Sequence, residues 1–311
     1  MNYLKLLFIA VLIYNLTGCT TTKTSLQNIE VDGTIVNLPI RITENKTAGT
    51  FELHFNYLKN NTPTLNTNVE GHSKVNNNGL FIVESVPNET YYIERSGVNT
   101  NEYIGDNLRW NTPEYAVSGD LDLAISNSFV FTGGFNYSKI NNKDYWSQNV
   151  ALGFYNEKET WATRFDIGFI FQEIYYKADY AEIEDINLNN HQTRKVYFYT
   201  QDKKDNYVTP YISFTLNSRR ADWPINCFFN YTIGWQTIFN FEPEYHSFSD
   251  LGSFELSSTA HSFSAGLHKS FDDFGRLVGG VRYIKYTEDN GNLNLFNIFV
   301  QFDFLISNMM K

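Results

Sequence analysis

The chain has 311 residues, and 24 Lys and Arg against 34 Asp and Glu give it a formal net charge of −10. An acidic chain lacks the basic surface that releases counterions from nucleic acid, so we expect no nucleic-acid partner. Aromatic residues make up 17% of the chain and charged residues only 19%, which excludes a disordered protein.

The first segment, residues 1–18, has the pattern of a signal peptide. An apolar run of about nine residues follows Lys5, and a run of that length is too short to span a bilayer. It ends in Leu16-Thr17-Gly18-Cys19, which resembles the bacterial lipobox, where a small residue precedes a Cys that is acylated. The resemblance implies a lipid such as palmitate on Cys19 and, because Thr20 follows, sorting to the outer membrane. The alternatives are an ordinary signal peptide with a chance Cys, or a short membrane anchor.

Residues 19–46 are rich in Thr and Asn, and we predict a polar tether there. If Cys19 is acylated, Cys227 is the remaining thiol, and no intramolecular disulfide can form. The six His residues are scattered without metal-ligand spacing, so we expect no metal site and no cofactor.

From Thr47 onward, apolar and polar residues alternate, which is the signature of β-strands with two different faces. One face carries bulky stripes of Phe, Trp, Tyr, Leu and Val. The other carries Gly, Ala, Ser and isolated charges, namely Glu52, Asp120, Asp122, Arg164, Asp166, Arg276, Arg282 and Asp303. The pattern predicts an all-β fold.

The composition of the two faces predicts which one lies inside a barrel. The interior of a small barrel holds small polar side chains rather than stripes of Phe and Trp. Trp and Tyr also gather toward the ends of the stripes, as in the aromatic girdles of membrane barrels. We therefore predict that residues 47–311 form an antiparallel up-and-down transmembrane β-barrel with its apolar stripes outward. The alternative is a soluble lipocalin-like barrel in the periplasm, whose inward stripes bind an apolar ligand.

The connections predict a barrel of about ten strands (8–10), with short turns at one end and longer loops at the other. We expect the short ends to be periplasmic. The longer connections are Lys139–Asp144, Ala178–Asn206, Phe241–Ser257 and Thr287–Asn292.

Nine predicted strands follow one another from Tyr115 to the C-terminal end of the chain. A barrel that closes with antiparallel pairing needs an even number of strands, so one further strand must precede Tyr115. The best candidate for it is Thr47–Leu58. Residues 59–112 then become a long outer loop, in which Leu80–Val86 and Tyr91–Glu94 pair as a hairpin. The alternative is a small periplasmic domain over Ile29–Arg95, with the tenth strand elsewhere.

Four features together resemble small outer-membrane β-barrel lipoproteins of Gram-negative bacteria. They are Leu16–Cys19, the strand Thr47–Leu58, the Trp110–Ser138 hairpin and the C-terminal Phe302-Asp303-Phe304. The resemblance implies a cell-envelope protein of the outer membrane that is anchored by a lipid on Cys19. We expect it to be non-enzymatic, with a structural or surface-binding role.

The inward charges allow two interpretations, an ion-selective lumen in a narrow pore or an ion-pair network that plugs the barrel. If the last hairpin turns near Asp289-Asn290, Arg276 and Asp303 face each other across two strands, which favours the plug.

The sharpest catalytic candidate is His268-Lys269-Ser270, but no acidic residue is in place to orient the imidazole, so we expect no enzyme. The expected partners are outer-membrane lipid and an extracellular ligand bound by loops such as Glu182–Asn190 and Glu242–Leu251.

Overall fold

The fold is that of a computed structural model of the whole chain. The structure describes residues 19–33, 35, 37–43, 47–61, 63–67, 80–86, 89–94, 108–188, 191–220, 222–241, 254–271, 274–288 and 291–306. The expected signal peptide, residues 1–18, lies outside the described residues, as do the whole loop Glu242–Leu251 and the expected turn residues Asp289-Asn290. Over the described part of the chain, no helix is long and apolar enough to cross a bilayer.

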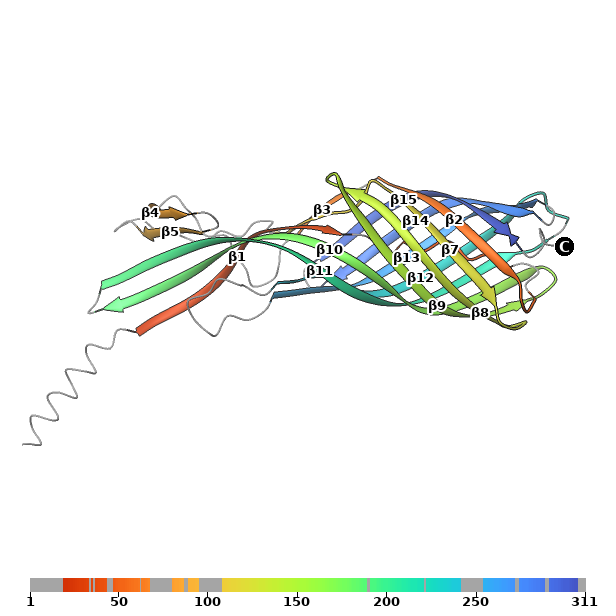
Figure 1. Cartoon of the computed structure of the whole chain (residues 1–311), viewed down its shortest axis with the longest axis horizontal. Coiled ribbons are helices and arrows are strands. Elements are labelled where there is room, and N and C mark those ends of the chain that lie inside the picture. The colour runs from red at the N-terminus through yellow and green to blue at the C-terminus, as the bar shows by residue number, and fades with distance from the viewer. Residues whose placement is uncertain are drawn as a thin grey trace, which may run out of the picture.

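Ten antiparallel strands close into a barrel (Figure 1). Each strand pairs with the next in the ring, and β15 pairs with β2 to close it. The prediction of an all-β barrel with its tenth strand before Tyr115 is confirmed. The alternative of a separate domain over Ile29–Arg95 is wrong, because part of that stretch is a barrel strand. The ring consists of β2 (Phe51–Asn60), β7 (Tyr115–Ala124), β8 (Phe129–Ile140), β9 (Lys143–Glu157), β10 (Trp161–Leu188), β11 (His191–Ser218), β12 (Asn226–Phe241), β13 (Phe254–Phe271), β14 (Gly275–Glu288) and β15 (Gly291–Leu305).

The period-two pattern places the apolar stripes on the outside of the barrel. Phe165, Ile167 and Phe169 on β10 have exposed fractions of 38%, 47% and 46%, while Arg164 and Asp166 between them are buried. All ten strands show this alternation, because successive side chains of a strand point to opposite faces. The stripes therefore face away from the interior, which contradicts the lipocalin-like alternative.

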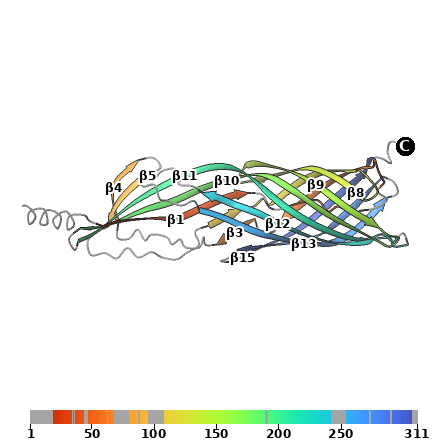
Figure 2. The same cartoon turned by 90° about the horizontal axis from the view of Figure 1, so that it is seen from below.

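The two ends of the barrel differ. At one end the connections are short, and we call it the short-turn end; at the other, strands project beyond the ring, and we call it the long-hairpin end (Figures 1 and 2). Three predicted loops at the long-hairpin end are wrong. Thr287–Asn292 continues β14 and β15 as paired strands up to Glu288 and Gly291. Lys139–Asp144 is a tight turn in which Asn141 and Asn142 adopt φ values of 49° and 64°. Ala178–Asn206 is the continuation of β10 and β11 as a paired hairpin.

A sheet extends this hairpin on both sides. β1 (Cys19–Gly33) pairs antiparallel with β10, β6 (Leu108–Asn111) pairs parallel with β1, and β3 (Thr64–Thr67) pairs with β6. On the other side, β5 (Glu89–Glu94) pairs with β11, and β4 (Leu80–Val86) pairs with β5. The predicted hairpin inside residues 59–112 is thus formed by β4 and β5.

The polar tether expected over residues 19–46 is not what the structure shows. Residues 19–33 form β1, which occupies the edge of β10 beyond the point where β9 stops pairing with it. Residues 35 and 37–43 follow β1 and are buried inside the barrel. A polar segment can be ordered in this way when long-range partners satisfy its backbone groups, which local composition does not reveal.

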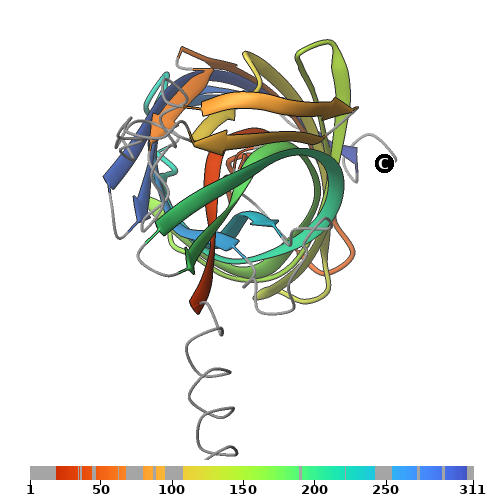
Figure 3. The same cartoon turned by 90° about the vertical axis from the view of Figure 1, so that its left-hand side faces the viewer.

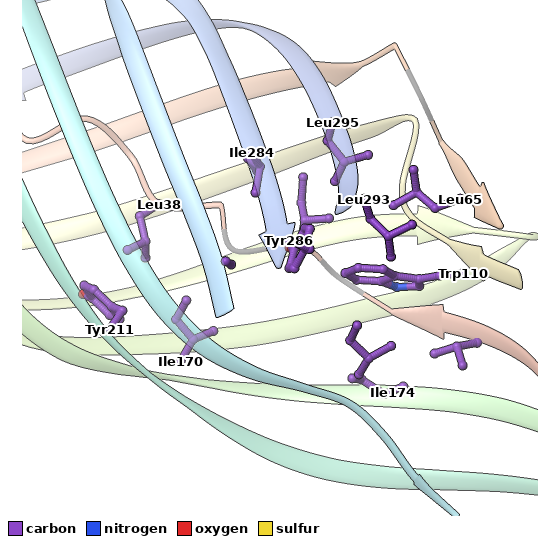
Figure 4. Packing of buried hydrophobic residues seen from close by; sticks show 14 of the residues in the cluster. Leu38, Leu65, Trp110, Ile170, Ile174, Tyr211, Ile284, Tyr286, Leu293 and Leu295 are labelled. Atoms are coloured by element: carbon purple, nitrogen blue, oxygen red, sulfur yellow. The ribbon is translucent and has the colours of Figure 1, made fainter. Parts of the chain in front are cut away.

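An apolar cluster lies between the barrel interior and the projecting sheet (Figure 4). Trp110 on β6 is fully buried and packs edge-on against Tyr286 of β14, with ring centroids 4.8 Å apart. Leu65, Ile174 and Leu293 surround it in Figure 4. The part of the cluster around Trp110 thus caps the polar interior at the long-hairpin end.

Candidate functional site

The candidate site is the interior of the barrel, which is occupied by residues 37–43, here called the lumen segment. Viewed from the long-hairpin end, the strands form a ring and the red strand β1 runs across its opening (Figure 3). The segment contacts inward-facing side chains of β7, β9, β10, β11, β14 and β15, and each of its residues is buried. These contacts surround it on all sides.

Arg41 is the central contact of the lumen segment. Its guanidinium donates to Asp120 of β7 at 2.8 Å, to Asn149 of β9 at 3.1 Å and to the Tyr211 hydroxyl of β11 at 3.2 Å. It also lies 3.7 Å from the Asp166 carboxylate of β10. One side chain of the segment therefore links four strands of the wall, and the five donors of a guanidinium suit such a site.

Two side-chain amides of the wall hold the backbone of the segment. Gln301 accepts from the Ile40 backbone N–H at 2.7 Å and donates to the Ile40 carbonyl oxygen at 2.6 Å. Asn217 does the same for Thr43, at 3.3 and 3.2 Å. Each amide supplies one acceptor and one donor, as a neighbouring β-strand would, so the wall satisfies an extended backbone in its interior.

Arg282 of β14 completes the contacts nearer the long-hairpin end. It donates to the Leu38 carbonyl at 2.6 Å, to the Asn37 side-chain oxygen and to Ser264 at 3.0 Å, and lies over the Phe299 ring at 5.3 Å. Two of its acceptors belong to the lumen segment. Without the segment, a buried guanidinium would lose these acceptors, which is costly in a confined interior.

Two further ion-pair groups lie toward the short-turn end. In one, Arg164 pairs with Asp122 and, at 2.9 Å, with Asp166. In the other, Arg276 pairs with Glu52 and, at 3.0 Å, with Asp303, and it also donates to the Ile42 carbonyl at 3.4 Å.

His54 of β2 connects these two groups. One ring nitrogen lies 2.8 Å from Asp303 and the other lies 3.3 Å from Asp122. The Nδ1 contact is a hydrogen bond, whereas the Nε2 contact has the distance of an ion pair, and two flanking carboxylates favour the charged imidazolium. The imidazole thereby joins the ion pairs of both arginines into one network.

All eight residues that the sequence analysis assigned to the lumen are buried in the interior. The structure brings seven of them into the ion-pair network around Arg41 and His54, while Arg282 lies apart from the carboxylates. Arg41, which lies in the expected tether, and His54, which is not among the predicted inward charges, were not predicted as lumen residues. A signal for both existed: five acidic residues against three arginines leave a buried negative excess, which calls for further cations.

One group of described residues has the ligand types of a metal site. Ligand atoms of Glu52, His54 and Asp122 lie within 4.8 Å of one another. Arg276 already pairs with Glu52, and Arg164 with Asp122. Because guanidinium groups compensate these carboxylates, the arrangement fits an ion-pair network better than a cation site.

A cavity of about 520 Å³ opens where β10 and β11 leave the barrel. Its lining combines Asp32 of β1 with Tyr175, Lys143 and Lys204. The two ammonium groups lie over the Tyr175 ring, at 5.0 and 5.2 Å from its centroid. The cavity offers charged, hydroxyl and aromatic groups to a polar ligand on the long-hairpin end.

The catalytic candidate His268-Lys269-Ser270 lies in the last residues of β13, near the short-turn end. His268 is buried, and its Nε2 lies 3.2 Å from the Ser218 carbonyl oxygen. Ser270 is exposed and lies opposite Arg276 in the β13–β14 register. The imidazole is therefore engaged with a backbone carbonyl of β11.

No family model and no curated protein matches the chain. Among solved structures, it is similar to the translocator domain of autotransporter NalP from Neisseria meningitidis, with 6% identity, coverage of 84% of this chain and 90% of that one, and a TM-score of 0.31. It is also similar to the CymD monoaromatic hydrocarbon channel, with 8% identity, coverage of 84% of this chain and 89% of that one, and a TM-score of 0.28. OccK11 from Pseudomonas aeruginosa matches with 9% identity, coverage of 85% of this chain and 99% of that one, and a TM-score of 0.22. This likeness assigns neither a family nor a function to the chain.

Proposed function

We propose that the chain is a non-enzymatic outer-membrane β-barrel lipoprotein with a structural or surface-binding role, whose lumen is closed by its own N-terminal segment. The observation that carries the proposal is the reversed polarity of the barrel. Large apolar side chains cover the outside, while the interior holds an ion-pair network around residues 37–43.

The outward stripes support a membrane location. Leu152 on β9, Val208 on β11 and Val300 on β15 have exposed fractions of 50% to 52%. A water-soluble barrel would leave this continuous belt in contact with water, whereas lipid solvates it favourably. Tyr115, Tyr137 and Trp146 gather near the long-hairpin end of the belt, where aromatic side chains suit the membrane–water interface.

The contacts of the lumen segment support a closed lumen rather than an open pore. Arg41, Gln301 and Asn217 hold the segment through side-chain and backbone hydrogen bonds. We expect the full-length protein to give a flat current trace in planar bilayers after its insertion has been verified. Discrete, reproducible single-channel steps from the wild-type chain would contradict a closed resting state.

A narrow pore that opens when the segment leaves is the second candidate function. The polar wall behind the segment favours it, because Asn149, Thr209, Ser213 and Gln301 would line a hydrated passage. In this case Arg41→Ala should conduct while the wild type stays silent. Silence from both proteins, with equal insertion, would leave the structural role.

Lipidation of Cys19 is part of the proposal, and it rests on the lipobox resemblance. The intact mass of the protein purified from membranes should exceed that of the unmodified mature chain by the mass of a diacylglycerol and an acyl group. A Cys19→Ser variant should lose that increment. Equal masses, after allowance for the substitution and any change in signal-peptide cleavage, would rule out the anchor while leaving the barrel unaffected.

A surface-binding role is supported by the projecting sheet and by the cavity beside Tyr175. These place charged and aromatic groups at the long-hairpin end, where an extracellular ligand would approach. The exposed Ser270 and the engaged His268 support a non-enzymatic role. A Tyr175→Ala variant should lose binding of such a ligand without losing the heat-resistant fold.

A further inference from the structure

The first observation is where the chain enters the barrel wall. Just before β2, the Gly49 N–H donates to the Ala124 carbonyl at 2.8 Å, and the Ala48 N–H donates to the Asn127 side chain at 3.3 Å. Ala124 ends β7 and Asn127 lies in the β7–β8 turn, so both partners are at the short-turn end. The C-terminal end of β15 lies at the same end, because Leu305 pairs with Glu52.

The second observation is the order of contacts along the lumen segment. Thr43 contacts Asn217, which lies next to the end of β11 at Ser218, and Ile42 contacts Arg276, the second residue of β14. Leu38 contacts Arg282, six positions further along β14 toward the long-hairpin end. Read from residue 43 back to residue 37, the segment therefore runs along the barrel from the short-turn end toward the long-hairpin end.

The third observation is where the segment emerges. Gly33 pairs with Ile174 of β10, above the last residues that β9 and β10 share. From there β1 runs along β10 to Cys19, whose strand partner is Asn187 near the tip of the hairpin, and β6 flanks β1 over Ile29–Asp32. Asp32 fixes β1 at the rim through hydrogen bonds from Asn141 at 2.8 Å and Tyr145 at 3.2 Å.

We infer that the N-terminal segment crosses the membrane inside the barrel, so that β1 and the modification site Cys19 stand on the opposite side from the short turns. With the short turns in the periplasm, the orientation on which the proposed surface-binding role rests, Cys19 is on the cell surface. Asn187 lies fifteen residues beyond Gln172 on β10, which corresponds to about 50 Å of strand at about 3.3 Å per residue. An acyl group on Cys19 is therefore not positioned to anchor the chain in the periplasmic leaflet.

The inference leads to a labelling experiment on intact cells with a membrane-impermeant maleimide. The background is the full chain with Cys227→Ser, and it also serves as the blank. Three single reporters are added at exposed positions: Asn28→Cys on β1, Asp202→Cys on the β11 part of the hairpin, and Glu159→Cys in the β9–β10 short turn. Each is compared before and after permeabilisation of the outer membrane.

We expect Asn28→Cys and Asp202→Cys to react fully in intact cells, and Glu159→Cys only after permeabilisation. Reaction of Asp202→Cys without Asn28→Cys would overturn the inference, because β1 would then lie on the other side from the hairpin. Reaction of Glu159→Cys alone would show the reverse orientation. That result would overturn the surface location and the proposed orientation, while the crossing itself would stand.

A second measurement tests the crossing independently of orientation. Thr43→Cys combined with Asn217→Cys in the same background should form a disulfide, because the two residues exchange hydrogen bonds inside the barrel. The matched control combines Thr43→Cys with Leu216→Cys, the adjacent residue of β11 whose side chain points outward. Equal disulfide yields from the two pairs would contradict a segment inside the lumen.

Discussion

Replacing Arg41 by Ala tests whether the lumen segment is held by its charged contact. The substitution removes the cation that Asp120 contacts at 2.8 Å and one of the two that face Asp166. It also leaves the Tyr211 hydroxyl and Asn149 without their guanidinium donor. Removing one partner of a buried ion pair costs about 3–5 kcal/mol, since the remaining charge is left uncompensated. The Arg41 side chain makes these contacts only while the segment lies in the lumen, so the cost acts on the equilibrium between the inserted and displaced segment.

The assay is the rate at which a thiol on the segment reacts with a maleimide in purified, folded protein. The reporter is Ile40→Cys in the Cys227→Ser background, because Ile40 is 1% exposed. A change of about 3–5 kcal/mol corresponds to about two to three and a half powers of ten in the displaced population, and the labelling rate should rise by that factor. Arg219→Ala is the matched control, because Arg219 pairs with Glu157 at the rim. Rates for Arg41→Ala and Arg219→Ala that agree within about threefold would show that the Arg41 contacts do not hold the segment in the lumen.

Three further predictions follow from the belt, the wall and the cap. Phe165→Arg places a charge on the outward stripe, which costs about 2–4 kcal/mol of insertion free energy, so the protein should fail to insert into membranes. The control Phe165→Leu should insert normally. Carbonate extraction of the membrane fraction distinguishes the two. Gly134→Ala should lower the unfolding temperature in SDS, because its Cβ would overlap the Asp120 carboxylate, whereas Gly133→Ala should not, as the nearest atom to its Cβ is 3.9 Å away. Trp110→Ala should remove about 3–5 kcal/mol of packing free energy from the cap and make β1 sensitive to limited proteolysis. Unchanged cleavage of β1 would show that the cap does not hold it.

The strands of the barrel could be predicted because the sequence of each strand alternates between residues that suit the outside and residues that suit the interior. Alternation between apolar and polar residues is local, and it places Phe165 outside and Asp166 inside without knowledge of any other strand. The pairing of Arg276 with Asp303 followed from the same pattern combined with a tight last turn. The number of strands then followed from antiparallel closure.

The lumen segment could not be predicted in this way, because its partners are remote. Gln301 is 261 positions away from Ile40, and the segment has no strand neighbour to impose a period of two. The projecting hairpin was missed for a different reason. The outer face of the β10 and β11 extension is polar, because this part of the hairpin lies away from the membrane. The pattern around Lys177 and Asp202 therefore predicted a loop, although the backbones of these two residues pair.

Heat-modifiability of the native protein, taken from a carbonate-washed membrane fraction, shows whether the apolar stripes of the barrel face lipid. A closed barrel with its apolar stripes in lipid should remain folded in SDS at room temperature and change its migration only after boiling. We expect this shift for the wild type. A protein that migrates identically with and without boiling, and that leaves the membrane when a Cys19→Ser substitution removes the anchor, would contradict a lipid-embedded barrel.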